Sequence, residues 1–160
     1  MRRLFWILGL SLLPIFVAAC TGAGSYGTAP APNPSTPATP PTASVSLADD
    51  ARLGQILINP DGRTLYYFVP ERGGVIVCTG ACTNFWPPSV TPTGSASPVA
   101  GAGLSGKLGV ITRAGGIAQL SYNDWPLYTF SGDKAAGQTN GQGVVGFGGT
   151  WFVATAGLKP

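Results

Sequence analysis

The chain carries the same short aromatic motif twice. The segment LYYFVPE at residues 65–71 aligns with LYTFSGD at residues 127–133, so both copies follow the pattern Tyr-x-aromatic-x-x-acid. An internal repeat of this kind predicts one fold built from two related halves. The motif residues are Tyr66, Phe68 and Glu71 in the first copy and Tyr128, Phe130 and Asp133 in the second.

Both copies have the alternation of β-strands. Tyr66 and Phe68 lie two residues apart, so they share one face of a strand, and the apolar residues beside them occupy the other face. Tyr128 and Phe130 are spaced in the same way. Strands that are apolar on both faces belong inside a sandwich or a barrel.

Beyond the first 44 residues, the rest of the chain favours strands and turns. No stretch has sustained helical spacing of apolar residues with helix caps. The sequence therefore predicts a compact all-β domain, sandwich- or barrel-like, built from two related β-hairpin repeats. The predicted strands are residues 55–59, 63–69, 109–113, 117–122, 126–130, 144–147 and 150–154, with turns at residues 59–62 and 123–124.

The N-terminus predicts export. Arg2 and Arg3 precede a largely apolar run over residues 4–19, which ends at Cys20. A basic start, an apolar run and small residues before a cleavage site describe a secretory signal peptide. As a helix the run would span about 24 Å, short of a hydrocarbon core of about 30 Å, so a transmembrane anchor is the weaker alternative.

The junction VAAC at residues 17–20 resembles the lipobox of bacterial lipoproteins. The resemblance implies that the Cys20 thiol is acylated and becomes the first residue of the mature chain. Several acyl chains anchor a protein stably, whereas a single chain is marginal. Thr21 in place of Asp favours, by analogy, the outer membrane in a cell that has one. The alternative is an ordinary signal peptide with an incidental cysteine.

Three segments follow from these observations. Residues 1–19 form the signal peptide, and residues 20–44 form a tether in which six prolines alternate with Ala, Ser, Thr and Asn. Such a composition has too little apolar mass for a core and predicts a disordered, extended linker. Residues 45–160 form the all-β domain, with repeats at about 53–88 and 108–154.

Composition excludes several classes of chemistry. The chain has no histidine, which removes Ser-His-Asp catalysis and histidine-bound metals. Loss of Arg2 and Arg3 leaves seven Lys and Arg against six Asp and Glu, so no basic stripe remains for nucleic acid. We expect no cofactor and no resident metal.

Cys78 and Cys82 remain as a pair once Cys20 carries lipid. An even pair in an oxidising compartment predicts a disulfide. The alternatives are a thioredoxin-type redox pair, weakened by the three residues between the cysteines, and a Cu(I) site without Met or His to complete it.

Taken together, the motifs resemble the bacterial predicted lipoproteins described as a "secreted repeat of unknown function". The resemblance covers residues 53–154 and includes the CTGAC segment at residues 78–82, the WPP segment at residues 86–88, and Trp151. Glu71 departs from the Asp that this family carries. The resemblance implies a cell-envelope module in tandem repeat, without an established activity.

These features predict a non-catalytic structural or binding module, lipid-anchored in the bacterial envelope, whose partner is an envelope glycan or protein. The motif aromatics are expected to pack in the core, with Glu71 and Asp133 capping turns or accepting from tyrosine hydroxyls. An aromatic platform for a glycan or peptide is the alternative for these residues. Two other functions remain open: redox or metal handling by Cys78 and Cys82, and hydrolysis of envelope polymers.

Overall fold

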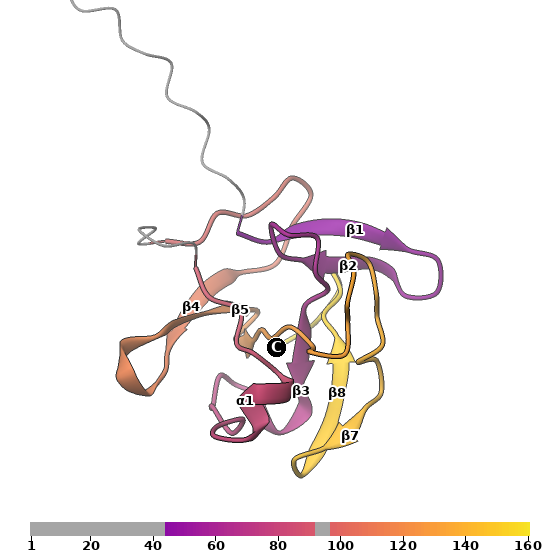
Figure 1. The fold of residues 1–160 in the computed structure, drawn as a ribbon. Helices are drawn as coiled ribbons and strands as arrows, with labels where there is room; N and C mark the ends of the chain where they lie inside the picture. The colour runs from indigo at the N-terminus through magenta and orange to yellow at the C-terminus, as the bar shows by residue number, and fades with distance from the viewer. Residues whose placement is uncertain (1–43, 92–96) are drawn as a thin grey trace, which may run out of the picture. The chain divides into compact units, whose positions relative to one another are not determined.

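The computed structural model describes residues 44–91 and 97–160 (Figure 1). The predicted signal peptide, Cys20 and all of the tether except Ser44 lie outside these residues. Within the described ranges, no helix has the length and apolar character needed to cross a membrane.

Short antiparallel strands dominate the domain. The described residues form eight strands in three antiparallel sheets. Across each sheet the order is β1 (Ser46–Asp50) and β2 (Gly54–Ile58); β3 (Tyr66–Phe68), β8 (Gly149–Val153) and β7 (Val145–Gly146); and β4 (Leu108–Thr112), β5 (Ala118–Tyr122) and β6 (Trp125–Pro126). The all-β prediction is confirmed, and the sandwich-like alternative fits because the described strands do not close into a barrel.

Some predicted strands are shorter than expected. The stretch predicted at residues 126–130 pairs as a strand only at β6, after which Tyr128 makes single bridges to Tyr66 and Pro88. β1 was not predicted, because its sequence SLADD ends in two acidic residues. A four-residue helix, α1 (Cys82–Phe85), also appears where no helical periodicity exists, and the Trp86 N–H donates to the Cys82 carbonyl at 2.9 Å.

The two halves repeat the same backbone hydrogen bonds. In the first half the Leu65 N–H donates to Leu57, the Ala154 N–H to Leu65, and the Leu57 N–H to Ala154. The second half makes the same three bonds. The equivalent residues are Leu127 for Leu65, Leu120 for Leu57 and Ser89 for Ala154.

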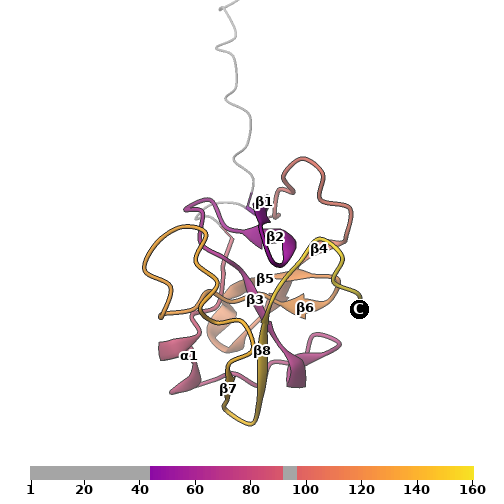
Figure 2. The ribbon, with the colours of Figure 1, turned by 90° about the vertical axis from the view of Figure 1, so that its right-hand side faces the viewer.

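This equivalence shows that the halves exchange segments. Ala154 follows the second motif in the chain but bonds to the first half, and Ser89 follows the first motif but bonds to the second half. β8 lies beside β3 for the same reason, as the two views show (Figures 1 and 2). Each half therefore includes a segment that belongs, in sequence, to the other half.

β3 lies between two core clusters. Tyr66 and Phe68 belong to the first cluster with Trp86, Tyr128 and Trp151. On the opposite face, Leu65 is buried in the second cluster and Tyr67 packs against it. The second cluster also contains Val45, Leu57, Leu120, Tyr122, Leu127 and Ala154. The prediction of a strand apolar on both faces holds, except that Val69 is exposed.

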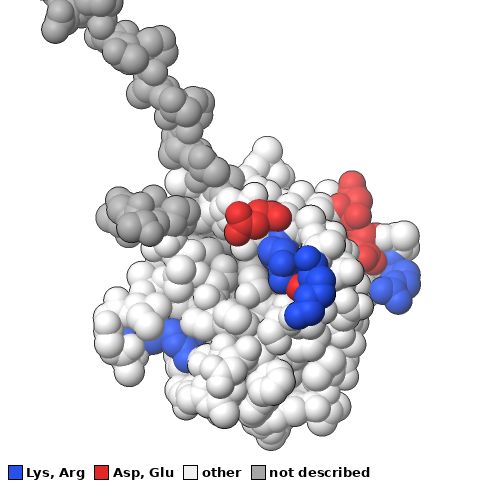
Figure 3. Space-filling view, in the orientation of Figure 1, with Lys and Arg blue, Asp and Glu red and all other residues white. Residues whose placement is uncertain are grey.

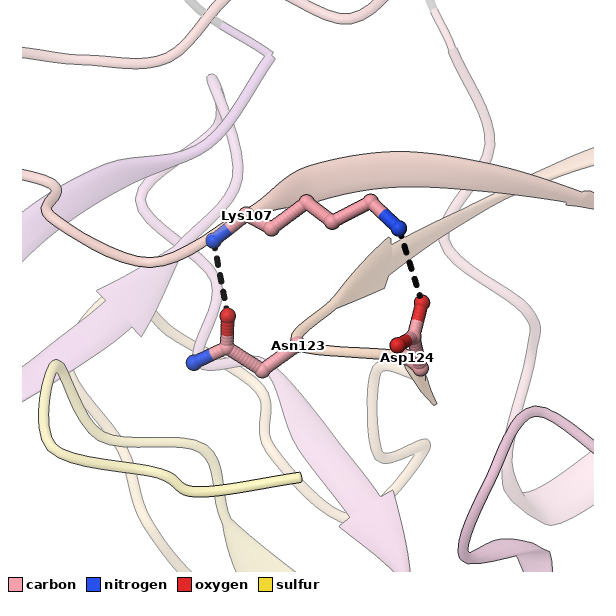
Figure 4. Close-up of polar contacts among 3 residues, drawn as sticks. All are labelled: Lys107, Asn123 and Asp124. Carbon is pink, nitrogen blue, oxygen red and sulfur yellow. Dashed lines mark hydrogen bonds and ion pairs between the residues drawn. The ribbon is translucent and has the colours of Figure 1, made fainter.

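The predicted turn at Asn123-Asp124 joins β5 to β6. Both residues have positive φ, 48° and 63°, as a tight hairpin turn requires. The Asn123 side chain accepts from the Lys107 N–H at 2.7 Å, and the Lys107 ammonium lies 3.4 Å from Asp124 (Figure 4). This ion pair is exposed, so it contributes little to stability. The contacts of these three residues therefore serve to hold the turn.

Candidate functional site

The two motif copies meet at their tyrosines. The Tyr66 N–H donates to the Tyr128 carbonyl at 2.8 Å, and the Tyr128 N–H donates back to the Tyr66 carbonyl at 2.9 Å. Both side chains are fully buried. The first motif position therefore forms the junction between the halves.

Each tyrosine hydroxyl donates to the carboxylate of the other copy. The Tyr66 hydroxyl lies 2.7 Å from Asp133 Oδ2, and the Tyr128 hydroxyl lies 3.0 Å from Glu71 Oε1. Glu71 and Asp133 are both buried. The motif thus places the acceptor expected for each tyrosine, but it does so across the repeats.

The carboxylates also fix the loops that follow them. Glu71 Oε1 accepts from the N–H groups of Val77 and Cys78, each at 2.6 Å. Asp133 Oδ1 accepts from the Asn140 N–H at 3.0 Å. Each carboxylate therefore bonds to the tyrosine of the other half and to the loop that follows its own motif. In this way it connects that loop to the other half.

Stacked aromatic rings fill the space beside these pairs. The Trp86 and Trp151 rings lie 3.9 Å apart at an interplanar angle of 2°. Phe130 stacks on Trp86 at 4.3 Å, and Phe68 stacks on Trp151 at 4.3 Å. Of the six motif side chains only Phe130 is half-buried rather than buried, so the motif does not form a surface platform.

Burial changes the ionisation of both motif tyrosines. Burial above all, then the hydrogen bond to Asp133, raises the pKa of Tyr66 above its ordinary value of 10.0. Burial and then the charge of Glu71 raise the pKa of Tyr128 in the same direction. Both hydroxyls therefore stay protonated in the folded protein at pH values where an unfolded tyrosine has ionised.

This difference predicts alkaline unfolding. Above pH 10.0 the unfolded chain loses the two protons that the folded chain keeps, so stability falls as pH rises. The slope should approach about 1.4 kcal/mol per pH unit for each tyrosine. Tyrosinate absorbance should show two tyrosines that ionise together with unfolding, and their independent ionisation in a folded protein would contradict the prediction.

The predicted disulfide is present. Cys78 and Cys82 are bonded, and both residues are buried. The bond closes the loop that leads into α1 and Trp86. Among the described residues, no three His, Cys, Asp or Glu side chains converge as a metal site would require.

A buried polar pair next to the second motif was not foreseen. Arg113 Nη1 donates to Gln119 Oε1 at 2.6 Å and to the Tyr128 hydroxyl at 3.1 Å, and its Nη2 donates to the Cys78 carbonyl. Gln119 also donates to the Leu127 carbonyl at 2.8 Å. The available signal was a glutamine between Ala118 and Leu120 inside a predicted strand.

A cavity of about 560 Å³ opens beside Arg113. The disulfide loop contributes Thr79 and Gly80 to one wall, and α1 contributes Thr83. The β4–β5 connection also lines the cavity, through Thr112, Ile117 and Ala114, which begins the short 3-10 turn η2 (Ala114–Gly116). The cavity is thus bounded on one side by a nearly buried cation.

The comparisons with known proteins agree with the internal repeat. A family model described as "secreted repeat of unknown function" matches the chain twice, at residues 48–89 and 109–155. The chain matches no curated protein and no solved structure. The two matched segments each contain one copy of the aromatic motif.

Proposed function

Since this chain belongs to the family of secreted repeats of unknown function, we propose that it is a lipid-anchored, non-catalytic module of the bacterial cell envelope. Its lipid would be carried on Cys20, and its partner would be an envelope glycan or protein. The export that the family description implies agrees with the basic and apolar start of the chain.

The burial of the repeat motif is the observation that carries a non-catalytic role. Tyr66, Tyr128, Glu71 and Asp133 use their polar atoms on one another and on backbone N–H groups inside the domain. A general acid or base must reach the proton that it transfers. Side chains committed to the interior support a rigid scaffold whose surface does the binding.

The charge of the surface supports the choice of partner. On the face shown in Figure 3 the charged side chains are few, both signs occur, and the region of the β7–β8 hairpin is uncharged. Binding to a polyanion such as nucleic acid relies on many Lys and Arg contacts to phosphate. A neutral or weakly charged envelope polymer fits this surface better.

The anchor is tested by replacing Cys20 with serine. The wild-type protein should fractionate with membranes and show a mature mass that includes acyl chains, whereas C20S should be unacylated and leave the membrane fraction. A serine keeps the size of the side chain but offers no thiol for acylation. Cys78→Ser, made in parallel, should keep the lipid. A wild-type protein without acyl chains would overturn the anchor.

The non-catalytic role is tested with isolated envelope polymers. Purified mature protein should be retained by peptidoglycan or by an envelope polysaccharide, and no soluble fragments should be released over long incubation. Release of fragments by wild type, lost in Asp133→Asn while folding is kept, would favour the hydrolase alternative instead.

A further inference from the structure

The charge of Arg113 has no anion in direct contact. Its side chain is 8% exposed, and its three acceptors are the uncharged oxygens of Gln119, Tyr128 and Cys78. Across residues 44–91 and 97–160 the one ion pair is Lys107 with Asp124. Glu71 shares the Tyr128 hydroxyl and the Cys78 backbone with Arg113, so this buried carboxylate lies near the cation without contacting it. An anion in the cavity would be the first to contact the guanidinium directly, where a buried cation is stabilised most.

The guanidinium also keeps donors for a ligand. An arginine has five N–H donors, and Arg113 uses three of them within the described residues. The same side chain lines the cavity. A carboxylate is the anion that pairs with an arginine through two parallel hydrogen bonds, which requires two donors on one edge.

The remaining walls of the cavity select what the carboxylate is attached to. Hydroxyls are present at Thr79, Thr83 and Thr112, and aliphatic surface is present at Ile76 and Ile117. These groups suit an amide-bearing chain with short apolar side groups. The volume of about 560 Å³ lies within the ordinary range of small-ligand sites.

The two halves differ in sequence at this site, which indicates a function that the repeated motif does not supply. Gln119 precedes Leu120, and its equivalent in the first half is Ile56, which precedes Leu57 and packs in the apolar core. Both halves keep the tyrosine–carboxylate pair, but the Tyr128 hydroxyl also accepts from Arg113, whereas the Tyr66 hydroxyl accepts from the Gly141 N–H. The polar change lies beside Arg113, which lines the cavity together with residues of both halves.

We propose that this cavity binds the C-terminal carboxylate end of a short peptide with small aliphatic side chains, and that Arg113 pairs with the carboxylate. This inference rests on the proposed binding role and names the ligand class. Such ends occur on envelope peptides built with D-amino acids and on ordinary protein C-termini. The shared chemistry is a carboxylate, one or two amides and methyl-sized side groups.

The experiment is calorimetric titration of the mature protein with N-acetyl-Ala-Ala, as the D,D and the L,L forms, each as free acid and as C-terminal amide. The free acid should bind at least tenfold more tightly than its amide. Preference for the D,D form would identify envelope peptides, and preference for the L,L form would identify protein C-termini. Equal binding of acid and amide, or no binding of any form, overturns the proposal.

Variants locate the site. Ala114→Trp should abolish binding, because Ala114 is exposed and its new ring would occupy the cavity without entering the core. Ala135→Trp is the matched control, since Ala135 is also exposed and does not line the cavity. Arg113→Lys should weaken binding of the acid more than of the amide. Retained acid binding in Ala114→Trp would overturn the assignment to this cavity.

Reduction of the disulfide provides an independent test of the site. Because Thr79 and Gly80 lie in the loop that Cys78 and Cys82 close, reduction should weaken binding of the free acid while the tryptophan core stays folded. If reduction leaves the binding of the free acid unchanged, the disulfide loop does not form part of the binding site. If the peptides fail to bind while envelope polymers are still retained, the peptide site is wrong and the proposed binding role stands.

Discussion

Replacing Trp86 with alanine should lower the free energy of unfolding by about 3–5 kcal/mol, which is a large part of the stability of a domain this size. Trp86 is 1% exposed and stacks between Trp151 and Phe130. The truncation would leave a void where the two halves meet, because Tyr66 also packs its ring edge against Trp86. Urea unfolding followed by circular dichroism measures the loss.

Two variants make this prediction specific. Trp86→Phe should lose less, because a smaller ring still stacks in the same place. Phe85→Ala removes a neighbouring aromatic ring that is 54% exposed, and its effect should stay within about 0.5 kcal/mol. Equal losses for Trp86→Ala and Phe85→Ala would show that the tryptophan stack does not hold the halves together.

Local pattern was sufficient to predict the class of fold. The alternation at Leu65-Tyr66 places one residue in each core cluster, as a strand buried on both faces requires. The NPDG turn at residues 59–62 forms where its residue types demand it, with the Gly62 N–H donating to Asn59. The disulfide was predicted from the even number of remaining cysteines and from the expected export of the chain, and it is present. These features depend on neighbours in the chain.

The choice of partner across the repeats could not be predicted. Within one motif Tyr66 and Glu71 are close in sequence, yet Tyr66 bonds to Asp133 and Glu71 bonds to Tyr128. The exchange follows from the antiparallel contact of the two tyrosine backbones, which no local pattern encodes. Arg113 was missed for a similar reason, because a charged residue at a predicted strand end is usually exposed.

Replacing Glu71 with alanine should cost about 3 kcal/mol or more. Glu71 Oε1 accepts from the Tyr128 hydroxyl and from the N–H groups of Val77 and Cys78. The Tyr128 hydroxyl and the Cys78 N–H are buried, and each buried donor left without an acceptor costs about 1–3 kcal/mol. The Val77 N–H lies in an exposed residue and adds less. The loop that carries the disulfide should loosen as well, so hydrogen exchange at the Val77 and Cys78 amides should rise more than at β5.

Glu71→Gln separates the acceptor from the charge. Glu71 Oε2 makes no hydrogen bond in the described part of the chain, so an amide nitrogen at that place lets the remaining oxygen keep the three donors. The glutamine variant keeps the acceptor but buries two amide N–H donors without a partner, so it should lose less stability than alanine without matching the wild type. In a double-mutant cycle with Tyr128→Phe, Glu71→Ala should show a coupling of about 0.5–3 kcal/mol, as residues in one hydrogen-bonded network do. Additive losses would mean that the tyrosine–carboxylate pair, the feature the two copies share, does not join the halves energetically.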